Sequence, residues 1–156
     1  MEIFIATMVV LLDWWSKEWV KKNLILGVSR KFIPRILNFH YTRNSGAAFS
    51  ILTGQRWLLS GLALVAILFM LIYRNRIIDG KIMMKVVYGL ILGGTIGNVI
   101  DRLRYGYVID FLEFSFVRFP IFNIADSALT LGVGLVLILL LQELIREGFD
   151  GTKHRS

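Results

Sequence analysis

Three aspartates in the second half of the chain stand at the ends of apolar segments. Asp101 closes one long apolar segment, Asp126 opens the next, and Asp110 lies in the short connection between them. A carboxylate near the centre of a membrane helix costs roughly 2.5–3.5 kcal/mol, so an ionisable group beside such a segment indicates a functional site. These aspartates are therefore candidates for acid–base chemistry.

A pair of aspartates can activate water for hydrolysis. Two carboxylates that converge cannot both ionise at short range, so they share one proton. The charged carboxylate then draws a proton from a trapped water while its partner protonates the oxygen of a scissile carbonyl. Asp110 and Asp126 suit these roles, because the connection between the two segments can fold back on the mouth of the second. This chemistry requires no metal and no cofactor.

Other hydrolytic mechanisms fit the residues less well. The only histidines are His40, in a strand-like segment, and His154, in the polar tail, so a Ser-His-Asp triad is disfavoured. No HExxH or similar zinc spacing occurs. Ser16 and Lys17 would point about 100° apart on a helix and cannot pair. Ser45 with Lys17 remains open as a Ser-Lys peptidase.

A protein that conducts protons or ions is the non-enzymatic alternative, since carboxylates inside membrane segments also serve that purpose. A conductor needs polar groups through the depth of the membrane. The segment 57–73 has none beyond Ser60, and the polar groups of the last two apolar segments gather at one end. Peptide hydrolysis is therefore the favoured interpretation.

Composition predicts one integral-membrane domain over residues 1–156. The chain is 56% hydrophobic with mean hydropathy +0.65, and it is too short for more than one compact bundle. Its 18 Lys and Arg give a net charge of +7, but they are scattered through the loops without the dense stripe that nucleic acids require. Membrane lipids are the expected partners. Disulfides are excluded because the chain has no cysteine.

The elements that position these residues are predicted to form an all-α membrane protein with four transmembrane helices. A small extramembrane β-sheet element is expected in the first loop, where Leu37, Phe39 and Tyr41 alternate with polar residues. Residues 146–156 are expected to form a flexible tail. The predicted helices span residues 3–21, 57–73, 82–101 and 123–144.

Four crossings place both termini on one side and loops one and three together on the other. Most of the polar motifs lie at the ends of these two loops, hence at one membrane face. Lys and Arg are as numerous in loop one as in loop two and the tail together, so they do not decide the orientation.

Two structural features accompany the candidate site. Asp13 and Lys17 fall at i and i+4 on one helix face, which favours an ion pair. Asp101 is next to Arg102 and on the Asn98 face, which favours an internal ion pair or hydrogen-bond network. Gly89, Gly93 and Gly97 recur at i+4 and make a groove for close helix packing. The apolar grooves beside Gly93 and Gly97 also suit acyl chains.

Five motifs in order make the chain similar to a known family. They are Asp13-Trp14-Trp15-Ser16-Lys17, Arg43-Asn44-Ser45-Gly46-Ala47-Ala48-Phe49, Gly93-Gly94-Thr95-Ile96-Gly97-Asn98-Val99-Ile100-Asp101-Arg102, Val108-Ile109-Asp110-Phe111 and Phe122-Asn123-Ile124-Ala125-Asp126-Ser127. With these motifs the chain resembles the lipoprotein signal peptidases, the type II signal peptidases of bacteria.

The resemblance implies an aspartyl endopeptidase that removes a signal peptide just before a diacylglyceryl-modified cysteine. It implies Asp110 and Asp126 as the catalytic dyad and lipid-modified prolipoproteins as substrates, with inhibition by globomycin-like compounds. The substrate-binding residues that it implies are Asn44, Gly46, Asn98, Arg102 and Asn123, and the structural supports are Asp13, Lys17 and Asp101.

The resemblance also implies a place in the cell. It predicts a multi-pass protein of the bacterial cytoplasmic (inner) membrane with both termini in the cytoplasm. The site then lies toward the outer face of that membrane.

Overall fold

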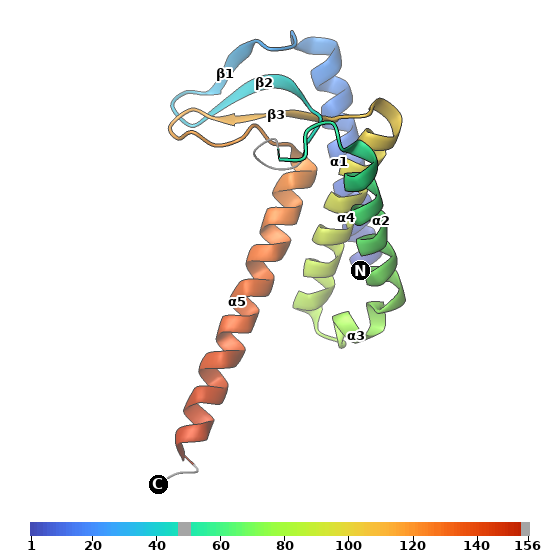
Figure 1. Ribbon diagram of the computed structural model, residues 1–156. Helices are drawn as coiled ribbons and strands as arrows, with labels where there is room; N and C mark the ends of the chain where they lie inside the picture. Colours follow the sequence, from blue (N-terminus) through green and yellow to red (C-terminus); the bar gives the residue numbers. More distant parts are fainter. Residues whose placement is uncertain (47–50, 154–156) are drawn as a thin grey trace.

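A bundle of helices with a small sheet at one end makes up the fold (Figure 1). The computed structural model describes residues 1–46 and 51–153, with side chains as far as residue 146. The helices are α1 Glu2–Asn23, α2 Arg56–Ile72, α3 Arg74–Ile78, α4 Ile82–Tyr105 and α5 Ile124–Lys153, and the strands are β1 Ser29–Ile33, β2 Leu37–Asn44 and β3 Val108–Phe114. Residues 47–49 of the predicted motif 43–49 lie outside the described residues.

Helix α4 is the centre of the bundle and contacts α1, α2, α3 and α5. Its glycines make these approaches possible. A Cβ added to Gly93 would lie 2.7 Å from the Ala6 carbonyl of α1, and one added to Gly97 would lie 2.8 Å from the Asp13 carboxylate and 3.1 Å from Ala125 Cβ of α5. The predicted packing groove is confirmed. The prediction that the grooves beside Gly93 and Gly97 suit acyl chains is wrong, because α1 and α5 already fill them.

The sheet has three antiparallel strands in the order β1-β2-β3. The predicted strand around Phe39 is confirmed as β2, but the third strand comes from the connection between the last two long helices, not from the first loop. Residues 108–114 of this connection form β3. Buried Ile109 and Phe111 pack with Tyr41 and Val20, so burial of this apolar face explains why the connection pairs with β2.

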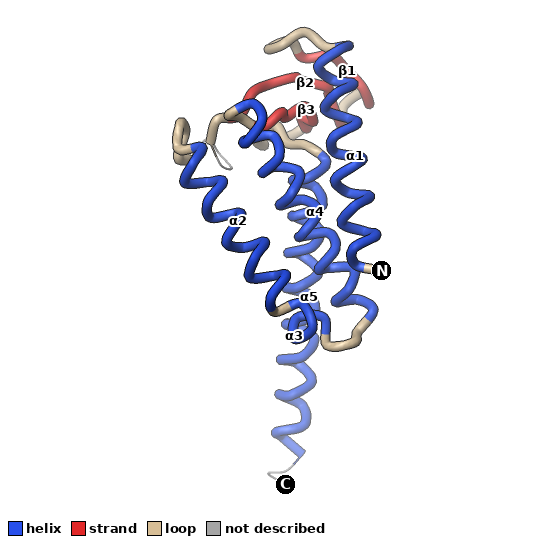
Figure 2. Tube along the Cα trace, turned by 90° about the vertical axis from the view of Figure 1, so that its right-hand side faces the viewer, coloured by secondary structure: helices blue, strands red, loops and turns tan. Residues whose placement is uncertain are grey.

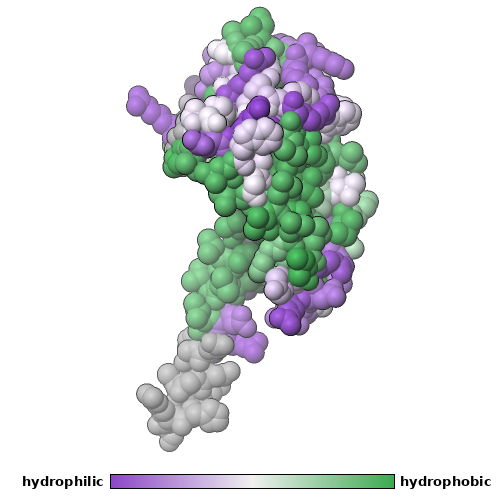
Figure 3. Space-filling view, turned by 45° about the vertical axis from the view of Figure 1, so that its right-hand side comes forward, coloured by the Kyte–Doolittle hydropathy of each residue, from purple (hydrophilic) through white to green (hydrophobic). Residues whose placement is uncertain are grey.

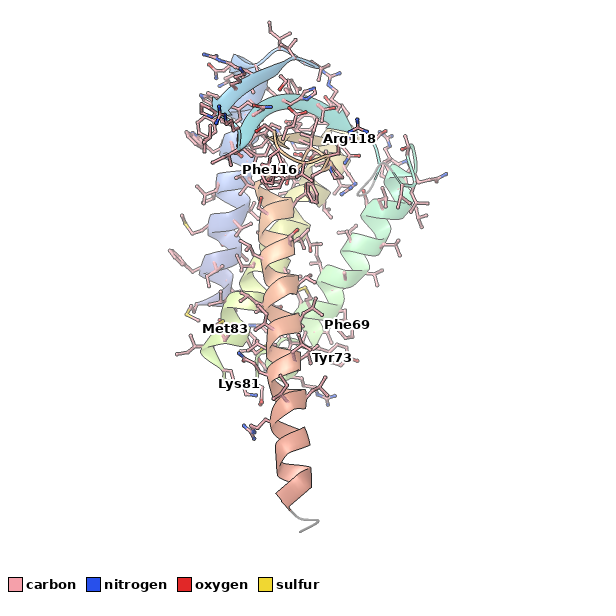
Figure 4. The ribbon with its side chains drawn as sticks, turned by 90° about the vertical axis from the view of Figure 1, so that its left-hand side faces the viewer. Phe69, Tyr73, Lys81, Met83, Phe116 and Arg118 are labelled. Carbon is pink, nitrogen blue, oxygen red and sulfur yellow. The ribbon has the colours of Figure 1, made fainter. Side chains whose placement is uncertain are left out.

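The two ends of the molecule differ in what they carry. Figures 1 and 2 show the sheet at one end, and both termini and α3 directed toward the other. Phe116 and Arg118 lie at the sheet end, whereas Tyr73, Lys81 and Met83 lie at the opposite end (Figure 4). The predicted gathering of loops one and three at one end is therefore confirmed as an arrangement of the chain.

An apolar belt separates the two polar ends on the face shown in Figure 3. Many of the large exposed side chains are hydrophobic, including Leu62, Val65 and Leu68 of α2 and Leu140 and Leu141 of α5. By length and composition, α4 and α5 are apolar enough to cross a membrane, while α2 is a shorter apolar helix of 17 residues. Such a belt suits a lipid environment.

Several boundaries differ from the predicted ones. Helix α1 runs two residues past the predicted end at residue 21, and α4 continues four residues past residue 101, until Gly106 (φ 82°) ends it in the left-handed region. The short helix α3 was not predicted. Helix α5 continues to Lys153, past the predicted helix end at residue 144.

Candidate active site

Asp110 and Asp126 come from different elements and meet at the first turn of α5. Asp110 stands on β3 opposite Thr42 of β2 and is 1% exposed. Asp126 is the third residue of α5 and is half-buried. The Asn123 side chain donates its Nδ2 hydrogen to Asp110 Oδ1 at 2.7 Å, while the Asn123 backbone N–H points to Asp126 Oδ2 at 3.3 Å. One asparagine thus links both carboxylates.

Asn123 is also the N-terminal cap of α5. Its Oδ1 accepts the Asp126 backbone N–H at 2.8 Å, and Asp126 in turn accepts the Asn123 backbone N–H. This reciprocal arrangement is a capping box with asparagine and aspartate in the two positions. Asp13 of α1 accepts the Ala125 backbone N–H at 2.9 Å. The first turn of α5, which carries Asp126, is therefore fixed by hydrogen bonds to both Asn123 and Asp13.

Asn44 and Asn98 complete the hydrogen bonds of the two carboxylates. Asn44 of β2 donates to Asp110 Oδ2 at 2.9 Å, and Asn98 of α4 donates to Asp126 Oδ1 at 2.7 Å. Each of the four carboxylate oxygens therefore accepts at least one N–H. Such an arrangement fixes both carboxylates in position before any substrate binds.

The environment of Asp110 favours its protonated form. Burial in the sheet is the largest influence, the neighbouring Asp126 acts in the same direction, and together they raise the pKa of Asp110 to about 7. Hydrogen bonds from Asn44 and Asn123, with the charge of Lys17, oppose the shift but do not cancel it. Asp110 therefore holds a proton over much of the range below neutral pH.

A buried group of charges supports the site from behind. Lys17 Nζ lies 2.7 Å from Asp13 Oδ2 and 2.8 Å from Asp101 Oδ2. Asp101 also accepts the Ile109 backbone N–H at 3.0 Å, one residue before Asp110. The predicted Asp13–Lys17 pair is present. The predicted internal network around Asp101 is present, but its cation is Lys17 on α1, not the neighbouring Arg102.

The same contacts bear on the Ser-Lys alternative. A lysine held between two carboxylates is a cation, and a cation cannot serve as the general base that Ser45 needs. The Lys17 ammonium also has Asn98 Oδ1 at 3.5 Å as a third acceptor. Its environment is therefore that of a structural cation.

Arg102 faces the first loop. Its Nη2 donates to the Gly46 carbonyl at 2.9 Å, and the Gly46 N–H donates to Asn44 Oδ1 at 2.9 Å. These bonds fix the oxygen of the Asn44 amide toward Gly46 and leave its nitrogen toward Asp110. The structure therefore brings together all five residues for which the resemblance implied a substrate-binding role.

A cavity of about 530 Å³ opens beside Asp126 between the sheet, α4 and α5. Asn44, Asn98 and Arg102 line its polar side, and the segment 119–122 with Leu129 and Leu131 lines its apolar side. Phe114, Phe119 and Phe122 pack against one another with ring centroids 5.0–5.8 Å apart. A peptide with an apolar flank could enter this space and reach Asp126.

No group of three or more His, Asp or Glu side chains stands ready to hold a metal ion among the residues that the structure describes. The site itself holds two carboxylates, three asparagine amides and the Arg102 guanidinium. Such groups can move a proton between water and a bound carbonyl.

Comparison with known proteins identifies the family. A family profile described as signal peptidase (SPase) II matches residues 5–142. The chain belongs to the signal peptidase II family. Proteins named lipoprotein signal peptidase are similar along most of the chain. One from Streptococcus agalactiae is 41% identical over 139 residues, covering 89% of this chain and 90% of the relative. One from Enterococcus faecalis is 39% identical over 153 residues, covering 95% and 93%.

Solved structures share this signal peptidase fold. A bacterial membrane enzyme determined by the in meso method at 2.3 Å resolution superposes with a TM-score of 0.87 at 35% identity, covering 92% of this chain and 88% of the other. A second, at 1.9 Å, gives a TM-score of 0.83 at 36% identity, covering 90% and 92%. The three-stranded sheet over a helical bundle is thus a fold shared with membrane enzymes.

Proposed function

We propose that the chain is an intramembrane aspartyl endopeptidase that cleaves the signal peptide of prolipoproteins immediately before the diacylglyceryl-modified cysteine. The observation that carries this proposal is the asymmetry of two linked carboxylates. Asp110 is buried with its pKa raised to about 7, whereas Asp126 lines the cavity. Two carboxylates with different environments are suited to opposite roles in acid–base catalysis.

In the proposed reaction Asp126 is the base and Asp110 the acid. Asp126 takes a proton from water, the resulting hydroxide attacks the scissile carbonyl carbon, and Asp110 gives its proton to the carbonyl oxygen. The tetrahedral intermediate then collapses as the C–N bond breaks. Asp126 delivers its proton to the leaving nitrogen, and Asp110 takes back the proton of the hydroxyl group. Both carboxylates end the cycle as they began.

Access to Asp110 requires a movement at Asn44. The Asn44 amide lines the cavity and covers Asp110 Oδ2. A bound peptide that displaces this amide exposes the acid to the scissile carbonyl. We assign Asn44, Asn98 and Arg102, which line the cavity, to substrate binding. Gly46 and Asn123 are included with them because they hydrogen-bond to these three residues.

The proposed membrane arrangement has four crossings formed by α1, α2, α4 and α5. Even α2, with 17 residues, is about 25 Å long at 1.5 Å per residue and approaches the thickness of a bilayer core. The protein is a multi-pass component of the bacterial inner membrane. Its termini are cytoplasmic, and the sheet and active site lie at the outer face.

The substrate carries two acyl chains, and the exposed apolar surface of α5 below the cavity offers them a place beside the protein. Membrane lipids occupy that surface otherwise. Globomycin-like inhibitors are expected in the same cavity, because a lipopeptide presents a peptide group and an acyl chain together.

Cleavage of a labelled prolipoprotein by the purified protein in detergent tests the function. The diacylglyceryl-modified precursor should be cut and the unmodified precursor should be cut poorly. Equal cleavage of both would refute the substrate assignment. Ion flux through liposomes without any cleavage would instead support the conductor.

A further inference from the structure

Lys17 lies behind the two catalytic candidates without touching either. Its side chain is 3% exposed, and its Nζ has three acceptors: Asp13 Oδ2 at 2.7 Å, Asp101 Oδ2 at 2.8 Å and Asn98 Oδ1 at 3.5 Å. An ammonium group has three protons and no lone pair. Asn98 must therefore present its oxygen, not its nitrogen, to Lys17.

This constraint decides which atom of Asn98 faces Asp126. With Oδ1 directed at Lys17, Nδ2 is the atom that lies 2.7 Å from Asp126 Oδ1. The Asn123 amide favours the same orientation of Asn98, since its Nδ2 donates to Asn98 Oδ1 at 3.2 Å. A rotated Asn98 amide would place an oxygen against a carboxylate and an NH₂ group against an ammonium.

We propose that Lys17 is a positioning residue of the active site, which holds Asn98 in the orientation that donates to Asp126 and so keeps this carboxylate ready to accept a proton from water. The inference rests on the proposed function. It assigns to Lys17 a role in proton transfer beyond the joining of helices.

The charged groups around Asp110 and Asp126 determine how the positioning role of Lys17 can be tested. Asp110 faces Asp126 from β3, β2 contributes the uncharged Asn44, and the cations that act on the two carboxylates are Lys17 of α1 and Arg102 of α4. Asp13 and Asp101 pair with Lys17. Loss of Lys17 alone leaves two buried carboxylates unpaired and threatens the fold. The three charges must therefore be removed together.

The test uses a neutral-cluster variant, defined as Asp13→Asn, Lys17→Met and Asp101→Asn combined. It is made in the wild-type protein and in an Asn98→Ala protein. Tryptophan fluorescence melting establishes that each protein folds, and kcat/KM is measured against pH with diacylglyceryl-modified precursor.

In the protein that retains Asn98, the neutral-cluster variant should lose about tenfold in kcat/KM, with the ascending limb of the pH profile moved by about one unit toward higher pH. In the Asn98→Ala protein the same three substitutions should change kcat/KM less than about twofold, because the group through which Lys17 acts is absent. Equal losses in both proteins would show that Lys17 acts by its charge alone and overturn the positioning role. A folded neutral-cluster variant whose pH profile has its ascending limb at the wild-type pH would overturn the positioning role as well.

Lys17→Arg keeps the inference testable if the neutral-cluster variant fails to fold. A guanidinium is also only a donor, so a folded Lys17→Arg protein should keep the wild-type pH limb, and a displaced limb would contradict the proposal. Failure of the proposed function would look different from these outcomes. In that case the Asp110→Asn and Asp126→Asn proteins would still cleave the precursor as the wild type does.

Discussion

Asn123 and Asp126 form a reciprocal cap: the Asp126 N–H donates to Asn123 Oδ1 at 2.8 Å, and the Asn123 N–H points to Asp126 Oδ2 at 3.3 Å. The Asn123 side chain therefore has two separable tasks. Its oxygen caps α5, and its nitrogen donates to Asp110 and to Asn98.

Asn123→Ser should separate these tasks. Serine caps a helix about as well as asparagine, whereas alanine costs about 0.5–2 kcal/mol. Asn123→Ser should therefore melt close to the wild type and Asn123→Ala well below it. Both should lose activity about 10- to 100-fold, because the buried Asp110 Oδ1 is left without its Asn123 donor. Wild-type cleavage by Asn123→Ser would contradict a role of Asn123 beyond capping.

The raised pKa of Asp110 predicts how activity depends on pH. The acid must hold its proton, so kcat/KM should fall as the pH rises through about 7. The measured midpoint belongs to the coupled pair of carboxylates. A flat profile between about pH 6 and 9 would argue against a protonated aspartate as the acid.

The same group makes stability depend on pH. The pKa of Asp110 is about 7 in the folded protein and about 3.9 when unfolded. Its contribution to stability is therefore fully present below the unfolded pKa and is lost as the pH rises through about 7. Asp110→Asn should remove this loss, so melting temperatures of variant and wild type should diverge as the pH rises between these values. Parallel melting curves would count against the raised pKa.

The buried cation should matter more to stability than an exposed one. Lys17→Met leaves Asp13 and Asp101 buried without a cation and should cost about 3–5 kcal/mol in the free energy of unfolding. Lys21→Met is the matched control on the same helix, because the Lys21–Glu18 pair, with side chains 25% and 28% exposed, is partly solvated and contributes only about 0–1 kcal/mol. Denaturation in detergent followed by tryptophan fluorescence measures both. Similar losses would contradict the structural role of the cluster.

Single cysteines test the orientation, since the chain has none of its own. The pair to compare is Val117→Cys, an exposed position between Phe116 and Arg118 of the sheet end, and Lys81→Cys at the opposite end. In intact spheroplasts an impermeant thiol reagent should label Val117→Cys, and it should label Lys81→Cys only after lysis. The reverse pattern would invert the proposed topology.

Residue patterns alone predicted the long helices, the strand around Phe39 and the gathering of polar motifs at one end, because apolar length and local periodicity determine these features. The third strand was not predicted, since it depends on burial of Ile109 and Phe111 against Tyr41, a contact distant in sequence. The partner of Asp101 was assigned wrongly for the same reason. Sequence proximity suggested Arg102, but the crossing of α1 and α4 supplies Lys17.

One feature of the site was detectable locally and was not recognised. The spacing of Asn123 and Asp126 at i and i+3 before an apolar run is that of a capping box. It places Asn123 before the helix instead of within it. The orientation of the Asn44 and Asn98 amides, by contrast, depends on Gly46 and Lys17 in other elements, so no local pattern reveals it.

Cleavage by aspartate variants tests the central claim most directly. Asn resembles Asp in shape but cannot act as a general base or share the proton. Asp110→Asn and Asp126→Asn should therefore each fold, melt no more than a few degrees below the wild type, and lose turnover by about three orders of magnitude or more. Asp101→Asn, which weakens the Lys17 cluster, should lose stability first. The assay is turnover of diacylglyceryl-modified precursor by each purified variant beside its melting curve. A stable but inactive Asp101→Asn together with an active Asp110→Asn would contradict the dyad, and activity in both Asp110→Asn and Asp126→Asn with a dead Ser45→Ala would replace the aspartyl mechanism with a serine one.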